Sequence, residues 1–203
     1  MIRCINILEK IIYTVGDRMQ YENLVKKQLS KHRYEHSVRV AQTAVKIAEA
    51  HDEDSNKAAI AGIMHDYCKE MPVEILIKKM VENKLMTSKY DLLMPQILHG
   101  PVASIVLKEQ NIITDPQILQ AIRFHTTGHW SMDRLAKIIF IADYVEPGRK
   151  TPNIEKILKI SLSDLDEGVL EIVNQTMEYL SSKNRLIHED MVKLRNEILT
   201  NKG

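Results

Sequence analysis

Apolar residues recur every three or four positions along almost the whole chain, which is the spacing of one face of an α-helix. Between residues 33 and 50, for example, one face of a long helix would carry Val38, Ala41, Val45 and Ala48. The sequence contains no series of short alternating runs joined by hairpin turns, so a β-sheet is not expected. The pattern therefore predicts an all-α fold.

Proline, glycine and capping residues divide this pattern into separate helices. Pro72, Pro101 and Pro116 fit first helical turns, because proline lacks the N–H that a helix interior needs. Gly128 and the Pro147-Gly148 pair fit helix ends. The predicted helices cover residues 33–50, 55–68, 72–82, 101–110, 115–125, 131–145, 163–182 and 188–200.

The composition excludes several classes of protein. With 28 Lys and Arg against 27 Asp and Glu, the net charge is +1, so electrostatic binding to nucleic acid is not expected. Two cysteines cannot form a disulfide framework, which indicates a reduced, cytoplasmic setting. No apolar run is long enough to span a bilayer and no cleavable signal is evident, so a soluble protein without a membrane partner is expected.

Three apolar runs end in residues that water would normally solvate. These residues are the pair His65-Asp66, then His125, and then Asp143. A carboxylate withdrawn from water is costly unless it is paired, hydrogen-bonded or bound to a metal. A single residue of this kind is explained by a core side chain that is hydrogen-bonded to the end of a helix. Three such run ends together favour a cation that they share.

The candidate ligands are His36, His65, Asp66 and Asp143, with His99 and His125 as a second cluster. Long gaps separate them, so they fit no compact structural zinc motif and would come from separate helices meeting inside a bundle. Imidazole and carboxylate without thiolate favour Fe, Mn, Zn or Co, as one ion or two. Adjacent His65 and Asp66 are about 100° apart around a helix, so one ion can touch both only near a helix end.

Lys69 lies one turn beyond this pair, on the same face. Its ammonium group could meet a phosphate bound to the metal. The sequence therefore combines a metal site with a cation suited to an anionic substrate.

Several strings of the sequence resemble those of one family. His36, His65-Asp66 and Asp143 are similar to the H…HD…D signature of the HD-domain superfamily of metal-dependent phosphohydrolases. The strings HRYEHS (32–37), HDYCK (65–69), HG (99–100), HTTG (125–128) and ADYVEPGR (142–149) narrow the resemblance to the YqeK family, over about residues 20–200. That family splits diadenosine tetraphosphate symmetrically into two ADP. The resemblance implies an HD-type helical bundle with a metal site in its core.

The resemblance also implies roles for the matching residues. His36, His65, Asp66 and Asp143 match iron ligands, while His99 and His125 match partners of a second metal or phosphate-facing histidines. Implied substrate contacts are Arg33, Lys69, His99, His125, Thr126, Arg149, Ile187 and His188. The implied catalytic residues are Asp66, which positions the metal, and Lys69 and His99, which neutralise charge on the phosphate oxygens. The implied cofactor is Fe, one or two ions, with Mn, Co or Zn as alternatives.

The chain departs from the family pattern in three places. His129-Trp130 replace the arginine that usually follows the HTTG string, and Glu189 replaces a frequent proline. Residues 1–18 precede the family's usual start, so they read as an N-terminal extension to a hydrolase domain at 19–203. Trp130 is interpreted as a core or loop anchor rather than a platform for base stacking.

The predicted function is symmetrical hydrolysis of dinucleoside tetraphosphates, with a metal-activated hydroxide attacking an inner phosphorus. One alternative is another HD-type activity: a 5′-nucleotidase, a deoxynucleotide triphosphohydrolase or a cyclic-nucleotide phosphodiesterase. A second is a nucleotide sensor without useful turnover, and a third is an HD-type di-iron oxygenase, against which Lys69 and the arginines argue. The expected partner is a small nucleotide, and the sequence also allows a homodimer.

Overall fold

The computed structural model describes residues 19–86 and 88–201, and the predicted extension at 1–18 lies outside them. Residues 19–28 are helical. The further elements are α2 (Lys31–Ala50), α3 (Ser55–Met64), α4 (Val73–Glu82), the 3-10 turns η1 (Asp91–Leu93) and η2 (Pro95–Ile97), α5 (His99–Glu109), α6 (Pro116–Phe124), α7 (Arg134–Val145), α8 (Ile154–Ser161), α9 (Leu165–Ser182) and α10 (Glu189–Thr200). These residues contain no strand, so the predicted all-α fold is confirmed.

Most predicted helices agree with the structure to within a few residues, but one predicted helix end was wrong, and the helical residues 19–28 and the helix α8 were outside the predicted ranges. The helix predicted over 55–68 ends at Met64, and turns follow it from His65 to Glu70. The short helix α8 was not predicted, although Ile154, Ile157 and Leu158 carry the helical spacing. Its start follows Asn153, whose φ of 62° ends the preceding loop in a left-handed conformation.

Aspartates fix the starts of four helices. The side chain of Asp54 accepts hydrogen bonds from two backbone N–H groups in the first turn of α3. Asp115 and Asp164 do the same for α6 and α9, and Asp133 accepts one such bond at α7. These N–H groups have no partner inside the helix, so each cap stabilises its helix by about 1 kcal/mol.

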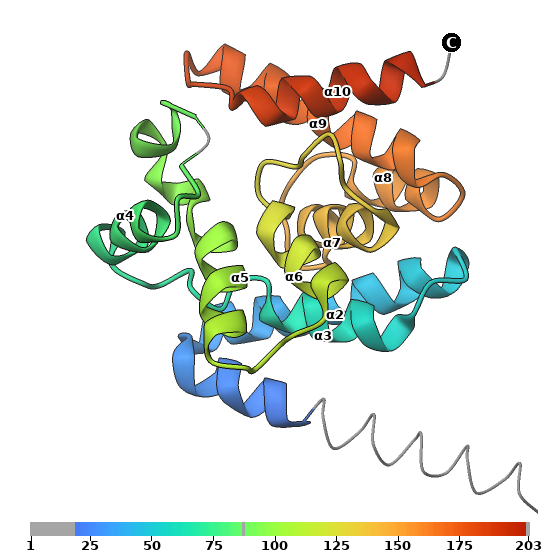
Figure 1. The fold of residues 1–203 in the computed structure, drawn as a ribbon. Helices are drawn as coiled ribbons and strands as arrows, with labels where there is room; N and C mark the ends of the chain where they lie inside the picture. Colours follow the sequence, from blue (N-terminus) through green and yellow to red (C-terminus); the bar gives the residue numbers. More distant parts are fainter. Residues whose placement is uncertain (1–18, 87, 202–203) are drawn as a thin grey trace, which may run out of the picture.

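Helix α7 lies at the centre of the bundle and packs against α2, α3, α6, α8 and α9. Its side chains Ile138, Ile139 and Ile141 are fully buried. In Figure 1, α8, α9 and α10 lie on one side of α7, with α2 and α3 on the other. The last turn of α7 therefore carries Asp143 into the interior between these two groups of helices.

Helices α2 and α3 approach closely at Gly62. A Cβ built on Gly62 would lie 2.7 Å from the Cα of Ala41, so only glycine fits between the two backbones. This contact sets the position of His36, on α2, relative to His65, which follows α3.

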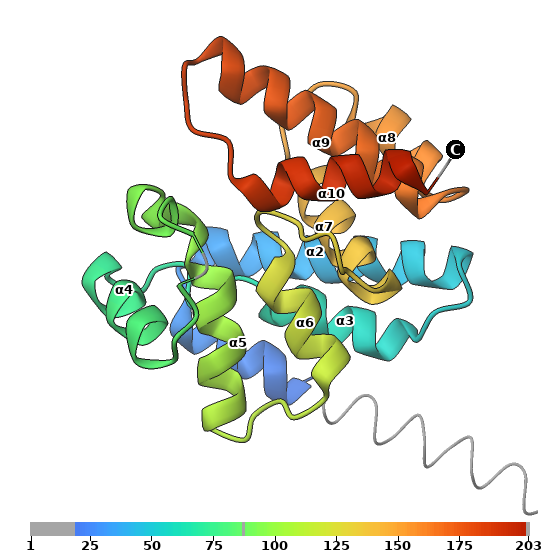
Figure 2. The ribbon, with the colours of Figure 1, turned by 45° about the horizontal axis from the view of Figure 1, so that its top comes forward.

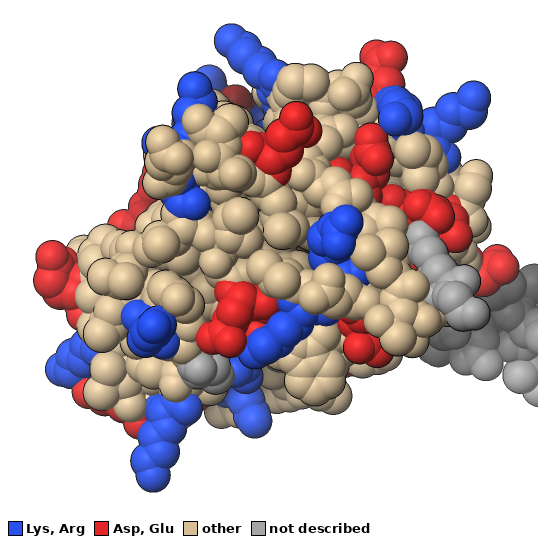
Figure 3. Space-filling model, turned by 90° about the horizontal axis from the view of Figure 1, so that it is seen from above, with Lys and Arg blue, Asp and Glu red and all other residues tan. Residues whose placement is uncertain are grey.

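Helix α10 lies alongside α9 and completes the bundle on that side (Figure 2). Figure 3 looks onto this side and shows acidic and basic side chains interspersed rather than gathered into one patch. This agrees with a net charge of +1. None of the helices within residues 19–86 and 88–201 has the length and apolar character needed to cross a membrane.

Candidate metal centre

Several elements converge on one point in the core, and each brings a histidine or an aspartate. The residues are His36 in α2, His65 and Asp66 directly after α3, His99 at the start of α5, His125 directly after α6, and Asp143 near the end of α7. All but Asp143 are at most 3% exposed. The structure thus brings together every ligand candidate that the sequence suggested.

Three of the histidines are held by backbone carbonyls. The Nδ1 atoms of His65, His99 and His125 each lie 2.7–2.9 Å from the carbonyl oxygen of the residue three positions earlier. Because a carbonyl can only accept, each Nδ1 donates a proton and each Nε2 keeps a lone pair. For His65 and His125 these carbonyls belong to the last turns of α3 and α6, where no helical N–H reaches them. A histidine at each helix end therefore satisfies the backbone and fixes its own ring.

His36 is oriented by a carboxylate instead. Its Nδ1 lies 3.1 Å from Oε1 of Glu146, and Glu146 accepts further bonds from Arg39 Nε at 2.5 Å and from the Gly148 N–H at 2.6 Å. Burial alone would raise the pKa of Glu146, but the bonds from Arg39 and Gly148 outweigh burial and hold the pKa below its usual value. A buried carboxylate behind a histidine is the usual support of a metal-ligating ring.

The Nε2 atoms of the four rings face one another and two carboxylates. His36 Nε2 lies 3.0 Å from Asp143 Oδ1. His99 Nε2 lies 3.0 Å from both Asp66 Oδ1 and His125 Nε2. Two nitrogen lone pairs and a carboxylate oxygen at such distances repel one another unless a cation or extra protons lie among them.

Within the described part of the chain, the buried Nε2 atoms of His36 and His65 make no hydrogen bond. Two triads place their ligand atoms within 4.8 Å of one another: His36, His65 and Asp143, and His65, Asp66 and His125. The two triads share His65. Orphaned nitrogens beside carboxylate oxygens therefore fit a divalent cation, or a pair of cations.

The protonation states agree with a metal site. Burial lowers the pKa of His65 to about 4, against the opposing charges of Asp66 and Asp143, and burial also lowers the pKa of His99. Both rings are therefore neutral near pH 7. Burial would raise the pKa of the Asp143 carboxyl, but opposing interactions, among them the charge of the bonded Arg149 guanidinium, hold this pKa below its usual range. Neutral imidazoles and ionised carboxylates are the forms that bind metals.

Three cationic side chains border the cluster. Lys69 Nζ lies 3.3 Å from His99 Nε2, and Arg33 Nη1 lies 3.4 Å from Asp66 Oδ2. Arg149 donates to the main-chain carbonyl of Asp143 at 2.9 Å and also to its carboxylate. Burial lowers the pKa of Lys69, although the nearby Asp66 charge opposes this. All three side chains remain partly exposed, so an anion arriving from solution can reach them.

Of the other predicted substrate contacts, the structure shows only Thr126 beside the cluster. Thr126 faces it, with Oγ1 3.2 Å from His125 Nε2. His188 uses both ring nitrogens within the protein, because Nε2 lies 3.1 Å from Asp91 Oδ1 and Nδ1 accepts the Asp190 N–H at 3.2 Å. Ile187 packs against the core.

A cavity of about 250 Å³ opens beside the cluster. It is lined by His125, Thr126, Asp143 and Arg149, together with residues of α7 and α9. A ligand in this cavity would therefore contact Arg149 and the cluster at the same time.

Residues 33–148 match the HD domain family, and this match covers more than half of the chain. This chain belongs to the HD-domain family. The predicted family resemblance is thereby confirmed, and His36, His65-Asp66 and Asp143 stand in the HD domain in the order that the signature requires. Two residues of this HD domain were missed from the sequence: Glu146 and Arg39, which hold His36. No local sequence pattern indicates these contacts. Glu146 directly precedes a Pro-Gly pair, and Arg39 lies one helical turn beyond His36.

Several proteins resemble this chain over most of its length. The symmetrical bis(5′-nucleosyl)-tetraphosphatase of Bacillus subtilis (strain 168) is 37% identical over 166 residues, which are 82% of this chain and 89% of that protein. The protein of the same name from Staphylococcus aureus (strain NCTC 8325 / PS 47) is 36% identical over 181 residues, 86% of this chain and 91% of that protein. A crystal structure from Clostridium acetobutylicum, described as a predicted HD superfamily hydrolase involved in NAD metabolism, superimposes with a TM-score of 0.86 at 34% identity and covers 90% of this chain and 96% of that chain.

Proposed function

We propose that this protein hydrolyses dinucleoside tetraphosphates symmetrically and splits diadenosine tetraphosphate into two ADP. The observation that carries the proposal is the buried cluster of imidazole nitrogens and carboxylates bordered by Lys69, Arg33 and Arg149. A metal centre with cations at its rim suits a polyphosphate substrate. Two similar proteins that carry the name of this activity match most of the chain, which supports the same reading.

The metal ligands in this proposal are His36, His65, Asp66 and Asp143, with His99 and His125 available to a second ion. Imidazole and carboxylate donors without thiolate suit Fe, Mn, Co or Zn, and we propose Fe as the native metal. When bound, a metal at this site lowers the pKa of a coordinated water and polarises phosphoryl oxygens.

The reaction adds the oxygen of one water molecule to an inner phosphorus and breaks the bridging P–O bond between the second and third phosphates. The bridging oxygen leaves with one ADP, the water oxygen stays on the other, and the protons of the water pass to the products and to solvent. Negative charge grows on the phosphate oxygens as the bond breaks. Lys69, Arg33 and Arg149 donate hydrogen bonds to these oxygens and offset this charge.

His99 and Thr126 complete the phosphate contacts that we propose. Both side chains face the same space as Lys69, since Thr126 Oγ1 lies 3.5 Å from His99 Nε2. His125, which directly precedes Thr126, is proposed as a further phosphate contact. Ile187 and His188 are proposed to contact a nucleoside rather than phosphate, with His188 acting through its ring because both of its nitrogens are already engaged.

A product assay tests the function. Protein loaded with Fe, Mn, Co or Mg is incubated with diadenosine tetraphosphate, and metal content is measured on the same sample. We expect ADP as the sole nucleotide product. AMP with ATP, or no reaction with any metal, would refute the proposal. Nucleoside monophosphates, deoxynucleoside triphosphates and cyclic nucleotides in the same panel separate the other HD-type activities.

We also propose that residues 19–203 act as one hydrolase domain in the cytoplasm. The buried free thiol of Cys68 and the low cysteine count support a reducing compartment. A homodimer stays a prediction, supported by the exposed apolar side chains of Val73, Ile75 and Val81 on α4. Light scattering of the purified protein checks the oligomeric state.

A further inference from the structure

A second cavity, of about 230 Å³, lies next to the metal cluster without including any of its ligand candidates. Leu98 and Pro101, on either side of His99, line it, and so do Phe124 and Thr127, on either side of His125. The cavity therefore adjoins the backbone that carries both histidines. It is separate from the cavity lined by Thr126 and Arg149.

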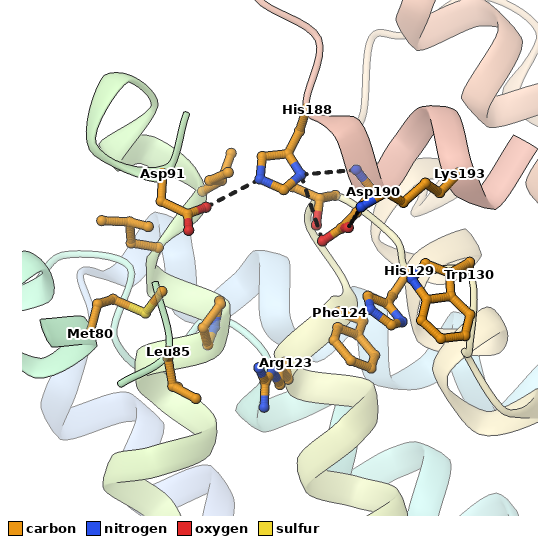
Figure 4. A pocket seen from close by; sticks show the side chains of 14 residues that line it. Met80, Leu85, Asp91, Arg123, Phe124, His129, Trp130, His188, Asp190 and Lys193 are labelled. Atoms are coloured by element: carbon orange, nitrogen blue, oxygen red, sulfur yellow. Dashed lines mark hydrogen bonds and ion pairs between the residues drawn. The ribbon is translucent and has the colours of Figure 1, made fainter. Parts of the chain in front are cut away.

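One wall of this second cavity is aromatic. The rings of Phe124 and His129 stack with their centroids 4.2 Å apart and their planes 7° apart, and the Trp130 ring follows at 4.9 Å from His129. Trp130 is 51% exposed and lies in the loop between α6 and α7, so of the core or loop anchor that the sequence suggested, the core position was wrong. Figure 4 shows these three side chains together at one end of the cavity. An exposed indole at a cavity wall offers a free ring face for stacking.

The rest of the cavity suits the other parts of a nucleotide. Met80 and Leu85 form an apolar wall on the side opposite the aromatic rings (Figure 4). The lining carries two cations, Arg123 and Lys193, and two carboxylates, Asp91 and Asp190. Asp190 lies 3.9 Å from Lys193, and Asp91 lies 3.1 Å from the His188 ring. A planar base can stack on the aromatic wall while phosphate oxygens meet Arg123 and ribose hydroxyls donate to the carboxylates.

We propose that Trp130 and His129 form a stacking platform for one nucleoside of the dinucleoside tetraphosphate, while the cavity beside Thr126 and Arg149 receives the other. This inference rests on the proposed function, because a symmetrical cut places two phosphates and a nucleoside on each side of the broken bond. The loop 125–130 lies between the two cavities. Its first residues, His125 and Thr126, line one cavity, and Thr127, His129 and Trp130 line the other.

Fluorescence tests the platform directly, since Trp130 is the only tryptophan in the sequence. We expect ADP to change the emission of the metal-loaded protein saturably, and inorganic pyrophosphate, which has no base, to leave it unchanged. An equal response to pyrophosphate, or no response to ADP at concentrations at which equilibrium dialysis shows ADP to be bound, would overturn the platform. This measurement does not depend on hydrolysis, so it stands even if diadenosine tetraphosphate is not the substrate.

Kinetics with diadenosine tetraphosphate provide a second test. Stacking on an aromatic side chain contributes about 1–3 kcal/mol per base, so Trp130→Ala should raise KM about tenfold with kcat within about twofold. Trp130→Phe, which keeps a ring, should recover most of the loss. Tyr179→Ala is the matched control, since Tyr179 is an equally exposed aromatic on α9 outside both cavities.

The two hypotheses fail in different ways. If the wild-type protein does not split diadenosine tetraphosphate, the proposed function fails and the fluorescence titration decides the platform. If the wild-type protein is active but Trp130→Ala leaves KM unchanged, the platform fails and the function stands.

Discussion

Oε1 of Glu146 lies 3.1 Å from Nδ1 of His36, although more than a hundred residues separate the two in the sequence. The contact keeps the Nδ1 proton on the outer side of the ring, so the Nε2 lone pair faces Asp143. Arg39 binds the other oxygen of Glu146. Arg39, Glu146 and His36 thus form a line of hydrogen-bonded side chains from the surface of α2 to the cluster of candidate ligands.

Glu146→Ala should therefore weaken metal binding, although every candidate metal ligand remains in the variant. Loss of an outer hydrogen-bond partner typically costs about 10–100-fold in metal affinity. The measurement is a titration of the metal against a competing chelator. Glu178→Ala, at an exposed carboxylate on α9, is the control and should bind metal as the wild type does. Equal affinity in the two variants would show that Glu146 does not position His36.

Asp143→Ala should remove metal and activity together. Asp143 is a ligand candidate of the His36 and His65 triad, so its loss should exceed the effect of an outer partner and reach about a hundredfold or more. Because this side chain is 20% exposed, the fold should persist, which circular dichroism checks. Full metal content and full activity in the variant would remove Asp143 from the site.

Lys69→Ala should keep the metal but lose catalytic efficiency. A hydrogen bond to a charged group contributes about 1.5–3 kcal/mol, so kcat/KM should fall by roughly 10–100-fold. Lys78→Ala, at a well-exposed lysine on α4, supplies the control. Steady-state kinetics and metal analysis on the same preparations make the comparison. Unchanged kinetics in Lys69→Ala would end the proposed contact between this ammonium group and phosphate.

The ligand candidates could be predicted from the sequence because burial of a charge after an apolar run is a local signal. Asp143 and His65 both end such runs. The condition that adjacent His65 and Asp66 lie near a helix end is met, because α3 ends at Met64 and leaves both residues in a turn. That ending was not visible in the periodicity, which continues to residue 68.

The supporting contacts could not be predicted, because they depend on how distant helices pack. Nothing local to Glu146 indicates that the packing of α2 against α7 will bring His36 to it. Likewise, the pairing of His188 with Asp91 joins the N-cap of α10 to η1, 97 positions earlier in the sequence. The exposure of Trp130 is a third such property, since an apolar ring in a loop gives no sign of which side it presents.

Acid should destabilise the metal-free protein through His65. The unfolded chain takes up a proton on this ring near pH 6.5, whereas the folded chain does so only near pH 4, because burial lowers the pKa. Between these values the unfolded state binds more protons, so stability is present above pH 6.5 and falls as the pH drops toward 4, by about 3 kcal/mol. Thermal unfolding in chelator over this range measures the slope.

His65→Asn should flatten that slope, whereas His32→Asn, at an exposed ring of α2, should leave it unchanged. Both variants are compared with the wild type at each pH, so a general loss of stability is separated from a change of slope. An unaltered slope in His65→Asn would mean that another group controls the acid response.

Gly62→Ala should disturb both the packing and the site. In an exposed helix, replacing glycine by alanine stabilises by about 1 kcal/mol through helix propensity. Here the new Cβ would lie 2.7 Å from a backbone atom of Ala41, so α2 and α3 must move apart, and overpacking of this kind typically costs about 1–3 kcal/mol. The clash should therefore outweigh propensity and lower Tm. Because the contact also sets His36 relative to His65, metal affinity should fall with it. Gln42→Ala is the control, because it also places alanine in a helix but at an exposed position of α2, where no clash accompanies it. A Tm equal to or above that of the wild type would show that the two helices tolerate the added methyl group.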